Sequence, residues 1–373
     1  MDETEKRKTI KVAVTGGPCG GKSEGITYVC QALEKPGVRT FVVEEIATRV
    51  FTTGISDIAE ISQSDPDMYY AIEESIILDQ IAQERICGAR ARIFSQDRSL
   101  VLCDRGGMDI SAYVPSERFH AILEDNRLTY FDVRDSYDLV VHMVTAANGA
   151  EESYNTRNNK ARREVTLEQA RARDEETLRA WIGHPCLRII DNSTDFIKKK
   201  ERLLRQVQKA FENTEIERRF LLKHSPNFNI PELEHAEQFL LDQVYIILPS
   251  GEQARIRRRR NGGYSHYSKT SKAGEGVERR QLAEEHIRAM EYFRLREFRD
   301  PHTSSTCKYR WYFVYKYQYF ELDMFIDPRS GLWILEIELT STNDPIELPP
   351  FLDIEREVTD DREYSNYEIS RRR

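Results

Sequence analysis

Short, almost continuous apolar runs recur through the first half of the chain. They occupy residues 10–15, 40–43, 99–103, 138–143 and 187–190. Longer stretches with helical spacing of apolar residues lie between them, for example 70–91 and 166–181. Short buried strands that alternate with helices are typical of a parallel sheet covered on both faces. The first half is therefore predicted to be an α/β domain.

From Glu215 onward, polar and apolar residues alternate with a period of two. The alternating segments are 215–221, 239–248, 253–260, 264–270, 308–315, 319–326 and 333–339. Turn-forming residues separate these segments, and one amphipathic helix is expected at 283–298. This pattern predicts an antiparallel sheet or barrel. We expect a first domain of residues 1–212 and a second of residues 213–373.

A glycine-rich turn joins the first predicted strand to the first predicted helix. It fits the phosphate-loop pattern GxxxxGK[ST] with Gly16, Gly17, Pro18, Cys19, Gly20, Gly21, Lys22 and Ser23. Glycines let backbone N–H groups turn toward a phosphate, and the helix start adds its positive dipole end. We expect Lys22 to neutralise the β and γ phosphates and the Ser23 hydroxyl to hold Mg²⁺.

Two acidic residues end predicted strands of the same domain. Asp104 follows an apolar strand, where phosphate-loop proteins place a carboxylate that organises Mg²⁺. Glu45 ends another strand, at the edge where α/β sheets bind ligands. It faces a second substrate or a water, or it is a plain surface residue. Between 157 and 179, basic residues mixed with acidic ones predict either a phosphate-covering lid or a solvated helix face.

In the second half, several strands place two or more charged residues on one face. If the sheet closes, these charges line an interior that is stable only when they pair, hydrate or bind ions. The carboxylates predicted to coordinate Mg²⁺ or Mn²⁺ are Glu215, Glu217, Glu321, Asp323, Glu336 and Glu338. The cations predicted to bind phosphate oxygens are Arg219, Arg255, Arg257, Lys272 and Arg310. No catalytic residue is assigned.

Composition narrows the class of protein. The formal net charge of the 373-residue chain is −8, and both halves are mildly acidic, so neither is a general binder of nucleic acid. Six cysteines lack metal-ligand spacing and fit a reducing compartment. No apolar run reaches the length of a membrane helix, and the charged start is not typical of a signal peptide. A cytoplasmic protein is expected.

The second half resembles the CYTH family of tunnel barrels, which includes triphosphatases. The resemblance is carried by Glu215-x-Glu217-x-Arg219, then Arg255-x-Arg257, followed by the late pairs of carboxylates. The family's opening motif has Lys where this chain has Arg219. Because Arg does not replace a catalytic Lys freely, triphosphate hydrolysis is not assigned from the resemblance.

The first half looks like the nicotinamide-riboside-kinase-like branch of phosphate-loop proteins, through 15–23, Glu45, 104–106 and Asp109. Together with 141–151, 181–185 and 191–196, the whole chain is similar to the TRPL translocation defect protein family. That resemblance implies GTP binding, and ATP is the alternative nucleotide. It also implies recognition of anionic phospholipids such as phosphatidic acid and phosphoinositides, peripheral membrane association, and a role in membrane-protein trafficking.

Three functions stay open at this stage. The first is a regulator that binds GTP and phospholipid. The second is an enzyme, either a phosphotransferase or nucleoside kinase in the first domain or a metal-dependent triphosphatase in the second. The third is a scaffold whose nucleotide site is structural. The motifs do not determine the base, although residues 191–193 follow the last predicted strand and are expected near it.

Overall fold

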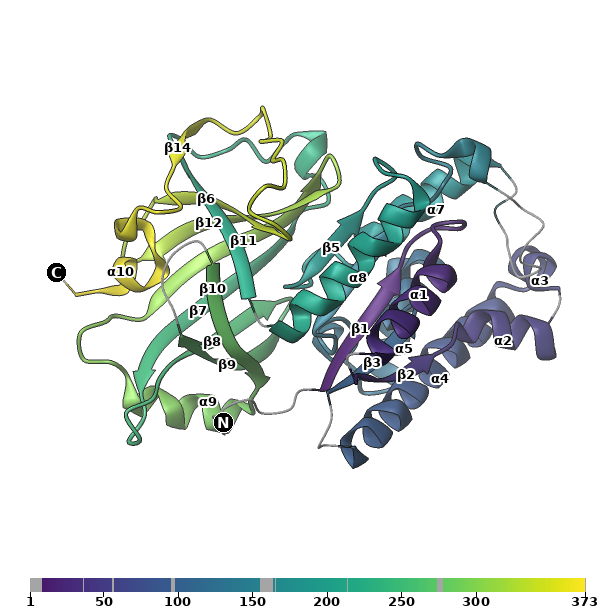
Figure 1. Cartoon of the computed structure of the whole chain (residues 1–373), viewed down its shortest axis with the longest axis horizontal. Helices are drawn as coiled ribbons and strands as arrows, with labels where there is room; N and C mark the ends of the chain where they lie inside the picture. The colour runs from purple at the N-terminus through teal and green to yellow at the C-terminus, as the bar shows by residue number, and fades with distance from the viewer. Residues whose placement is uncertain are drawn as a thin grey trace. The chain divides into compact units, whose positions relative to one another are not determined.

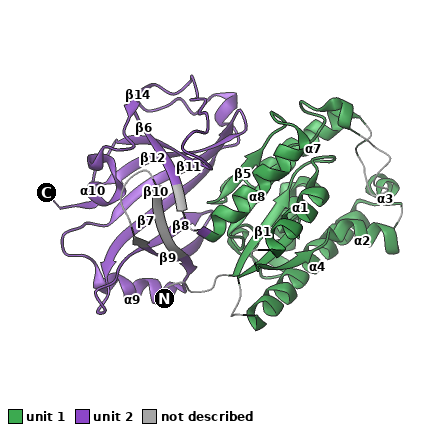
Figure 2. Cartoon of the chain, viewed as in Figure 1, with its two compact units in different colours: residues 1–211 green, residues 212–373 purple. Residues whose placement is uncertain are grey.

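The structure is a computed structural model of the whole chain. It describes residues 9–372 except Pro36, Ser56, 95–97, 155–163, Val165, Asn213 and 274–277. The side chains of 214–215, 272–273 and 278–283 are not described either. The chain divides into two compact units, residues 1–211 and residues 212–373 (Figure 2).

Unit 1 contains five parallel strands in the order β2-β3-β1-β4-β5 (Figure 1). The strands are β1 (Thr9–Thr15), β2 (Arg39–Val43), β3 (Ser99–Asp104), β4 (Leu139–Met143) and β5 (Leu187–Ile190). The helices are α1 (Lys22–Glu34), α2 (Ile46–Thr53), α3 (Ile58–Ser64), α4 (Pro66–Ile93), α5 (Ser116–Asp125), α6 (Tyr130–Arg134), α7 (Leu167–Ala180) and α8 (Phe196–Glu212). The predicted α/β fold is confirmed.

The core of unit 1 explains why these strands are almost wholly apolar. Ile10, Val12 and Val14 of β1 pack with residues of α1 and α8 on one face of the sheet. The long helix α4 packs against β1, β2 and β3, and Lys11 of β1 bonds to Glu84 of α4, which places that helix on the opposite face. Strands covered on both faces bury every side chain, so alternation is lost.

Unit 2 is a nine-stranded antiparallel sheet in the order β10-β9-β8-β7-β11-β12-β13-β6-β14. The strands are β6 (Thr214–Leu222), β7 (Glu237–Ile247), β8 (Gln253–Asn261), β9 (Tyr264–Ala273), β10 (Glu278–His286), β11 (Thr306–Tyr315), β12 (Gln318–Asp327), β13 (Trp333–Leu339) and β14 (Ile354–Glu357). Helices α9 (Ala289–Leu295) and α10 (Asn366–Ser370) complete the unit. Strand β10 also pairs with β6, so the run from β10 to β6 closes into a barrel.

The two faces of the barrel wall differ in character. Phe220, Leu335 and Ile337 form an apolar cluster with Phe320 and with side chains from the connections at 228–236 and 346–354. Tyr292 of α9 packs in the same way on apolar residues of β7 and β8. Because these segments cover the outside, the alternate, charged residues face the interior. The predicted antiparallel barrel with a polar interior is present.

One predicted element is wrong in its extent. Helical spacing indicated a helix over 283–298, but residues 283–286 belong to strand β10 and the α-helix spans only Ala289–Leu295. Strand pairing with β9 determines the outcome, since Glu284 aligns with Thr270 and Glu285 with Lys269. Tertiary pairing overrides local helix propensity here.

The outer core of the barrel gives a stability prediction. Phe320 is fully buried in the apolar cluster, so Phe320→Ala should lower the free energy of unfolding of unit 2 by about 3–5 kcal/mol. Met290 is 86% exposed, and Met290→Ala should change the free energy of unfolding by less than about 0.5 kcal/mol. Denaturant titration of both variants tests this, and equal losses would contradict the assignment of the core.

Candidate functional site

The glycine-rich loop follows the carboxyl end of β1 and passes against the end of β4. A Cβ on Gly16 would lie 2.2 Å from the carbonyl oxygen of Met143, and one on Gly20 would lie 2.5 Å from the same atom. Gly16 also has a φ of 132°, which L side chains rarely adopt. Any side chain at these two positions would push the loop off the sheet, so the loop geometry depends on both glycines.

Lys22 begins α1 and is buried beneath the loop. Its Nζ donates hydrogen bonds to the carbonyl oxygens of Gly16 and Gly17, each at 2.9 Å. Burial, and next the charge of Arg105, lowers the pKa of Lys22 below its usual value. A nearby anion would raise this pKa again and compete with the two carbonyls for the ammonium group.

Ser23 and Asp104 meet at the carboxyl edge of the sheet. Ser23 Oγ donates to Asp104 Oδ2 at 3.0 Å, and Asp104 Oδ1 is buried without a hydrogen-bond partner. Burial, followed by the negative charge of Glu45, raises the pKa of Asp104. A hydroxyl beside a carboxylate with one unused oxygen is the oxygen donor set that Mg²⁺ accepts next to phosphates, so these residues fit the predicted ion.

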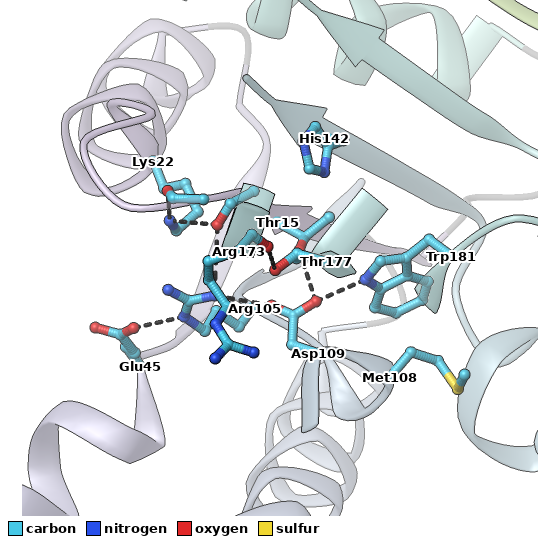
Figure 3. Close-up of polar contacts among 12 residues, drawn as sticks. Thr15, Lys22, Glu45, Arg105, Met108, Asp109, His142, Arg173, Thr177 and Trp181 are labelled. Carbon is cyan, nitrogen blue, oxygen red and sulfur yellow. Dashed lines mark hydrogen bonds and ion pairs between the residues drawn. The ribbon is translucent and has the colours of Figure 1, made fainter. Parts of the chain in front are cut away.

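A network of charged and polar side chains surrounds Arg105 (Figure 3). Arg105 Nε donates to Glu45 Oε1 at 2.5 Å, and its Nη1 lies 3.3 Å from Asp109 Oδ2. Asp109 Oδ1 also accepts from Thr15 Oγ1 and from the indole of Trp181, both at 2.6 Å. Glu45 therefore lies in the site and is tied to the loop region through Arg105.

The pKa of Glu45 reflects a balance of opposing effects. Burial acts to raise it, but the positive charges of Arg105 and Lys22 and the hydrogen bond from Thr48 lower it to about 2. Glu45 is thus ionised at neutral pH. As an unprotonated carboxylate it accepts hydrogen bonds from cations or hydroxyl groups that enter the cavity.

Asp174 of α7 fastens the start of the loop. Its Oδ1 accepts from the backbone N–H of Gly17 at 2.7 Å, from that of Thr145 at 3.1 Å, and lies 3.1 Å from His142 Nε2. Burial opposes ionisation of Asp174, yet the interactions with His142 and the backbone lower its pKa. This role was not predictable from the sequence, because Asp174 stands among mixed charges at helical spacing.

One cavity of about 1490 Å³ lies at this edge of the sheet. It is lined by the loop, by Asp104, Arg105 and Glu45, and by the turn after β5 with Asn192, Thr194 and Phe196. Asn192 is held by hydrogen bonds to the carbonyl oxygens of Thr145 and Asn148, both at 2.7 Å. The turn expected near a base therefore lines the same cavity as the phosphate loop.

The predicted lid is only partly described. Arg157, Lys160, Arg162 and Arg163 lie outside the described residues. Arg171 donates to the carbonyl oxygen of Ala147 and to Glu151, and Arg173 pairs with Glu164 and Glu176. Both arginines are engaged by neighbouring groups of unit 1, and the other four basic residues are not described. The lid therefore stays a prediction.

The barrel interior of unit 2 is basic on one side. Arg255, Arg257 and Arg259 of β8 are buried and lie on the same face as Ser268 and Thr270 of β9. Glu284 of β10 is accessible to solvent, yet enough protein surrounds its carboxylate for desolvation to act on its pKa. The charges of Arg257 and Arg255 outweigh that effect and lower the pKa of Glu284.

On the other side of the interior, three carboxylates converge on Arg310. Its guanidinium binds Asp323 through two 2.6 Å hydrogen bonds, binds Glu336 at 2.5 Å, and also contacts Glu321. Lys308 pairs with Asp323 as well. These charges are therefore compensated within the protein, as a buried charge requires.

The remaining predicted residues of unit 2 have varied positions. Arg219 is buried opposite Glu336 and donates to the carbonyl oxygens of Thr359 and Tyr364. Glu217 pairs in register with Glu338 on neighbouring strands. The side chains of Glu215 and Lys272 lie outside the described residues.

No group of three or more His, Cys, Asp or Glu side chains in the described part of the chain is arranged to hold a metal ion. The barrel carboxylates Glu321, Asp323 and Glu336 bind Arg310 instead, so their metal role stays a prediction. Sequence reasoning also missed the contact between His266 and His286, whose ring nitrogens Nε2 and Nδ1 lie 3.0 Å apart between β9 and β10. Isolated histidines in charged strands carry no spacing signal.

Comparison with known proteins identifies a family for the first unit of the chain. Residues 11–199 match the model of a family described as an AAA domain. Two similar solved structures are described as a hypothetical protein and as an inorganic triphosphatase. Each is 25% identical to this chain over the matched part and has a TM-score of 0.29. The match covers 42% of this chain in both cases, and it covers 96% of the hypothetical protein and 93% of the triphosphatase. A search of curated proteins finds no match.

The charge network yields a pH prediction. Glu45 has a pKa of about 2 in the folded protein against an ordinary pKa of 4.5, so its ionised form stabilises the fold above pH 4.5. Glu45→Gln should lower the free energy of unfolding by up to about 3 kcal/mol at neutral pH. The difference should shrink as pH falls from about 4.5 to about 2.

Denaturant titrations of wild type and Glu45→Gln across that pH range measure this difference. Glu24→Gln provides the control, because Glu24 is exposed in the first turn of α1. A Glu45→Gln loss that did not change with pH would contradict the ionic origin of the effect.

Proposed function

Because this chain belongs to the family of AAA domains through residues 11–199, we propose that unit 1 binds a nucleoside triphosphate at the loop between β1 and α1. The observation that carries the proposal is the meeting of Ser23 and Asp104 beside the buried Lys22. Asp104 Oδ1 adds an unpartnered, buried acceptor at the same place. A phosphate chain with a divalent cation satisfies all three groups together.

The proposed nucleotide is GTP, on the strength of the family resemblance of the sequence, with ATP as the alternative. Ser23 Oγ and Asp104 would hold Mg²⁺, which neutralises phosphate charge and fixes the orientation of the phosphate oxygens. Lys22 would exchange its two carbonyl partners for phosphate oxygens. The backbone N–H groups of 18–23 would bind the phosphates, and the turn with Asn192 and Phe196 would border the base.

We further propose that unit 2 recognises phosphorylated anions, with the headgroup of an anionic phospholipid as the ligand. Arg255 and Arg257 support this, since guanidinium groups bind phosphate oxygens in pairs. Arg219 and Arg310 would have to exchange their carbonyl and carboxylate partners for phosphate oxygens. Their burial inside a barrel suits an anion that enters it, rather than a flat surface contact. A protein with both sites would be a GTP-dependent regulator of membrane-protein trafficking that associates peripherally with membranes.

The second candidate function is enzymatic. In unit 1, Glu45 and Arg105 line the same cavity as the phosphate loop, an arrangement that suits transfer of the γ-phosphate to a hydroxyl, as in nucleoside kinases. In unit 2, opposed rows of arginines and carboxylates suit a triphosphate substrate. Release of phosphate or phosphorylation of a nucleoside would favour the enzyme over the regulator.

The nucleotide proposal gives a prediction with opposite signs in two assays. Since the pKa of Asp104 is raised, its ionised form costs stability, so Asp104→Asn should increase the free energy of unfolding without ligand at neutral pH. The same variant should weaken Mg²⁺-dependent GTP binding at least about tenfold, because a charged ligand to the cation is lost.

Calorimetric titration of GTP and ATP with and without Mg²⁺ checks the binding, and thermal unfolding checks the stability. Asp125→Asn is a matched control, because Asp125 is exposed at the end of α5 and does not line the cavity. Full Mg²⁺-dependent affinity in Asp104→Asn would refute the metal role of this carboxylate.

The headgroup proposal is tested with vesicles that contain phosphatidic acid. The double variant Arg255→Gln and Arg257→Gln should reduce flotation with these vesicles. It removes two buried guanidinium groups that would bind the phosphate of the headgroup. Arg294→Gln, on the exposed surface of α9, is the control. Unchanged flotation in the double variant would remove the barrel arginines from lipid recognition, and tripolyphosphate turnover by wild type would favour the triphosphatase.

A further inference from the structure

A second hollow lies in unit 1, at the amino end of β1 rather than at the carboxyl end where the phosphate loop begins. Its volume is about 510 Å³. Its walls come from Thr9 and Lys11 of β1, from the carboxyl-terminal half of α4, from the turn after α5, and from residues 136–138. The two hollows share no lining residue.

Four basic side chains line this second hollow: Lys11, Arg85, Arg92 and Arg127. Lys11 is neutralised, because its Nζ lies 2.9 Å from Glu84 Oε2 and also donates to Ser136 Oγ. The three arginine side chains are exposed and have no hydrogen bond or ion pair among the residues that the structure describes. With Lys11 they give the lining four positive charges against the three carboxylates Glu84, Asp132 and Asp138, a net charge of +1.

The carboxylates beside the hollow are already occupied. Glu84 is buried and accepts from Lys11, from Gln80 Nε2 at 2.9 Å and from the Tyr137 hydroxyl at 2.5 Å. Asp132 accepts from the backbone N–H of Thr129 in the cap of α6, and Asp138 accepts from the backbone N–H of Lys11 at 2.7 Å. None of them pairs with the three arginines.

The helix that forms one wall contains a glycine where a helix former would be more stable. Gly88 lies within the 28-residue helix α4, where glycine costs about 1 kcal/mol relative to alanine. Packing does not require it, since a Cβ there would meet only Nη1 of Arg92, at 3.7 Å. Its missing side chain keeps the hollow open between Arg85 and Arg92, which lie on the same helix face.

Arg127 departs from local preference in the opposite way to Gly88, because it occupies a backbone position where glycine is usual. It follows the end of α5 with a φ of 55°. Its N–H bonds to the carbonyl of Glu124, and that of Leu128 bonds to the carbonyl of Leu123. This is a Schellman ending, whose left-handed residue is normally glycine. A side chain at this position is strained, yet Arg127 belongs to the lining of the hollow.

We propose that this hollow is a binding site for a small phosphorylated molecule. Three guanidinium groups offer paired donors to phosphate oxygens, and a volume of about 510 Å³ suits a ligand of metabolite size. The two residues that break local preference, Gly88 and Arg127, supply space and charge at the same place. This site is separate from the proposed nucleotide and headgroup sites and does not depend on them.

The floor of the hollow is connected to the phosphate-loop site by hydrogen bonds. Tyr137 Oη accepts from the backbone N–H of Gly107 at 3.1 Å, and Gln80 Nε2 lies 3.3 Å from the carbonyl oxygen of Arg105. Substitution of Lys11, Glu84 or Tyr137 would therefore disturb both sites. The arginines at the rim are the residues that test this site alone.

Hydrogen–deuterium exchange of the full chain, with inorganic pyrophosphate as the probe, locates binding independently of the other sites. Pyrophosphate should slow exchange in peptides from the end of α4 and from 123–128. The concentration for half-maximal protection should rise at least about tenfold in Arg85→Gln with Arg92→Gln. Arg90→Gln, on the same helix but outside the hollow, should match wild type.

A further variant separates ligand binding from folding. Arg127→Gly should raise the temperature of thermal unfolding, because it relieves the left-handed strain, while it weakens the pyrophosphate protection. Sulfate at equal ionic strength should protect these peptides less than pyrophosphate does. Absence of protection in wild type, or equal weakening in Arg90→Gln, would overturn the proposal.

Discussion

Mutual compensation of buried charges is the constraint on which the first unit depends. At the carboxyl edge of its sheet, Lys22, Arg105, Glu45 and Asp104 share a partly desolvated space. None of these charges is stable there alone. The ion pair between Arg105 and Glu45 satisfies two of them, whereas Asp104 keeps a raised pKa and an unpartnered oxygen. The edge is therefore stable as a fold and keeps a carboxylate oxygen that the proposed cation would bind.

The barrel of unit 2 solves a similar problem with a different arrangement. Its interior carries Arg310 among Glu321, Asp323 and Glu336, so charges of opposite sign satisfy each other through bidentate geometry. The β8 arginines lie in the same interior with Glu284 as a counter-charge. Such an interior gains little net stability from its ion pairs, since desolvation offsets their attraction. The apolar outer cluster around Phe320 stabilises the unit instead.

Both folds follow from local sequence patterns. Apolar runs such as 99–103 predicted strands buried on both faces, and alternation around 308–326 predicted a wall with a polar side. The phosphate loop and Asp104 were predictable because their chemistry requires fixed spacing after a strand. Asp174, Trp181 and His142 were not, since they act through contacts between residues far apart in the chain. Only folding brings these residues together, as with Gly17 and Asp174, which are 157 residues apart.

The extent of β10 was unpredictable for a related reason. Residues 283–286 have helical spacing and charged side chains, and only their pairing with β9 makes them a strand. The use of the barrel carboxylates was also hidden in the sequence. Spacing places Glu321 and Asp323 on one face, but it does not reveal that a guanidinium from a neighbouring strand lies among them. Long-range contacts determine which charges are left to bind a ligand.

A crystal structure of the protein with Mg²⁺ and a non-hydrolysable GTP analogue tests the central claim most directly. The account predicts Mg²⁺ bound to Ser23 Oγ with Asp104 beside it, and Lys22 Nζ moved from the carbonyl oxygens of Gly16 and Gly17 to the phosphates. A nucleotide bound elsewhere, with Lys22 still bonded to both carbonyls, would contradict it.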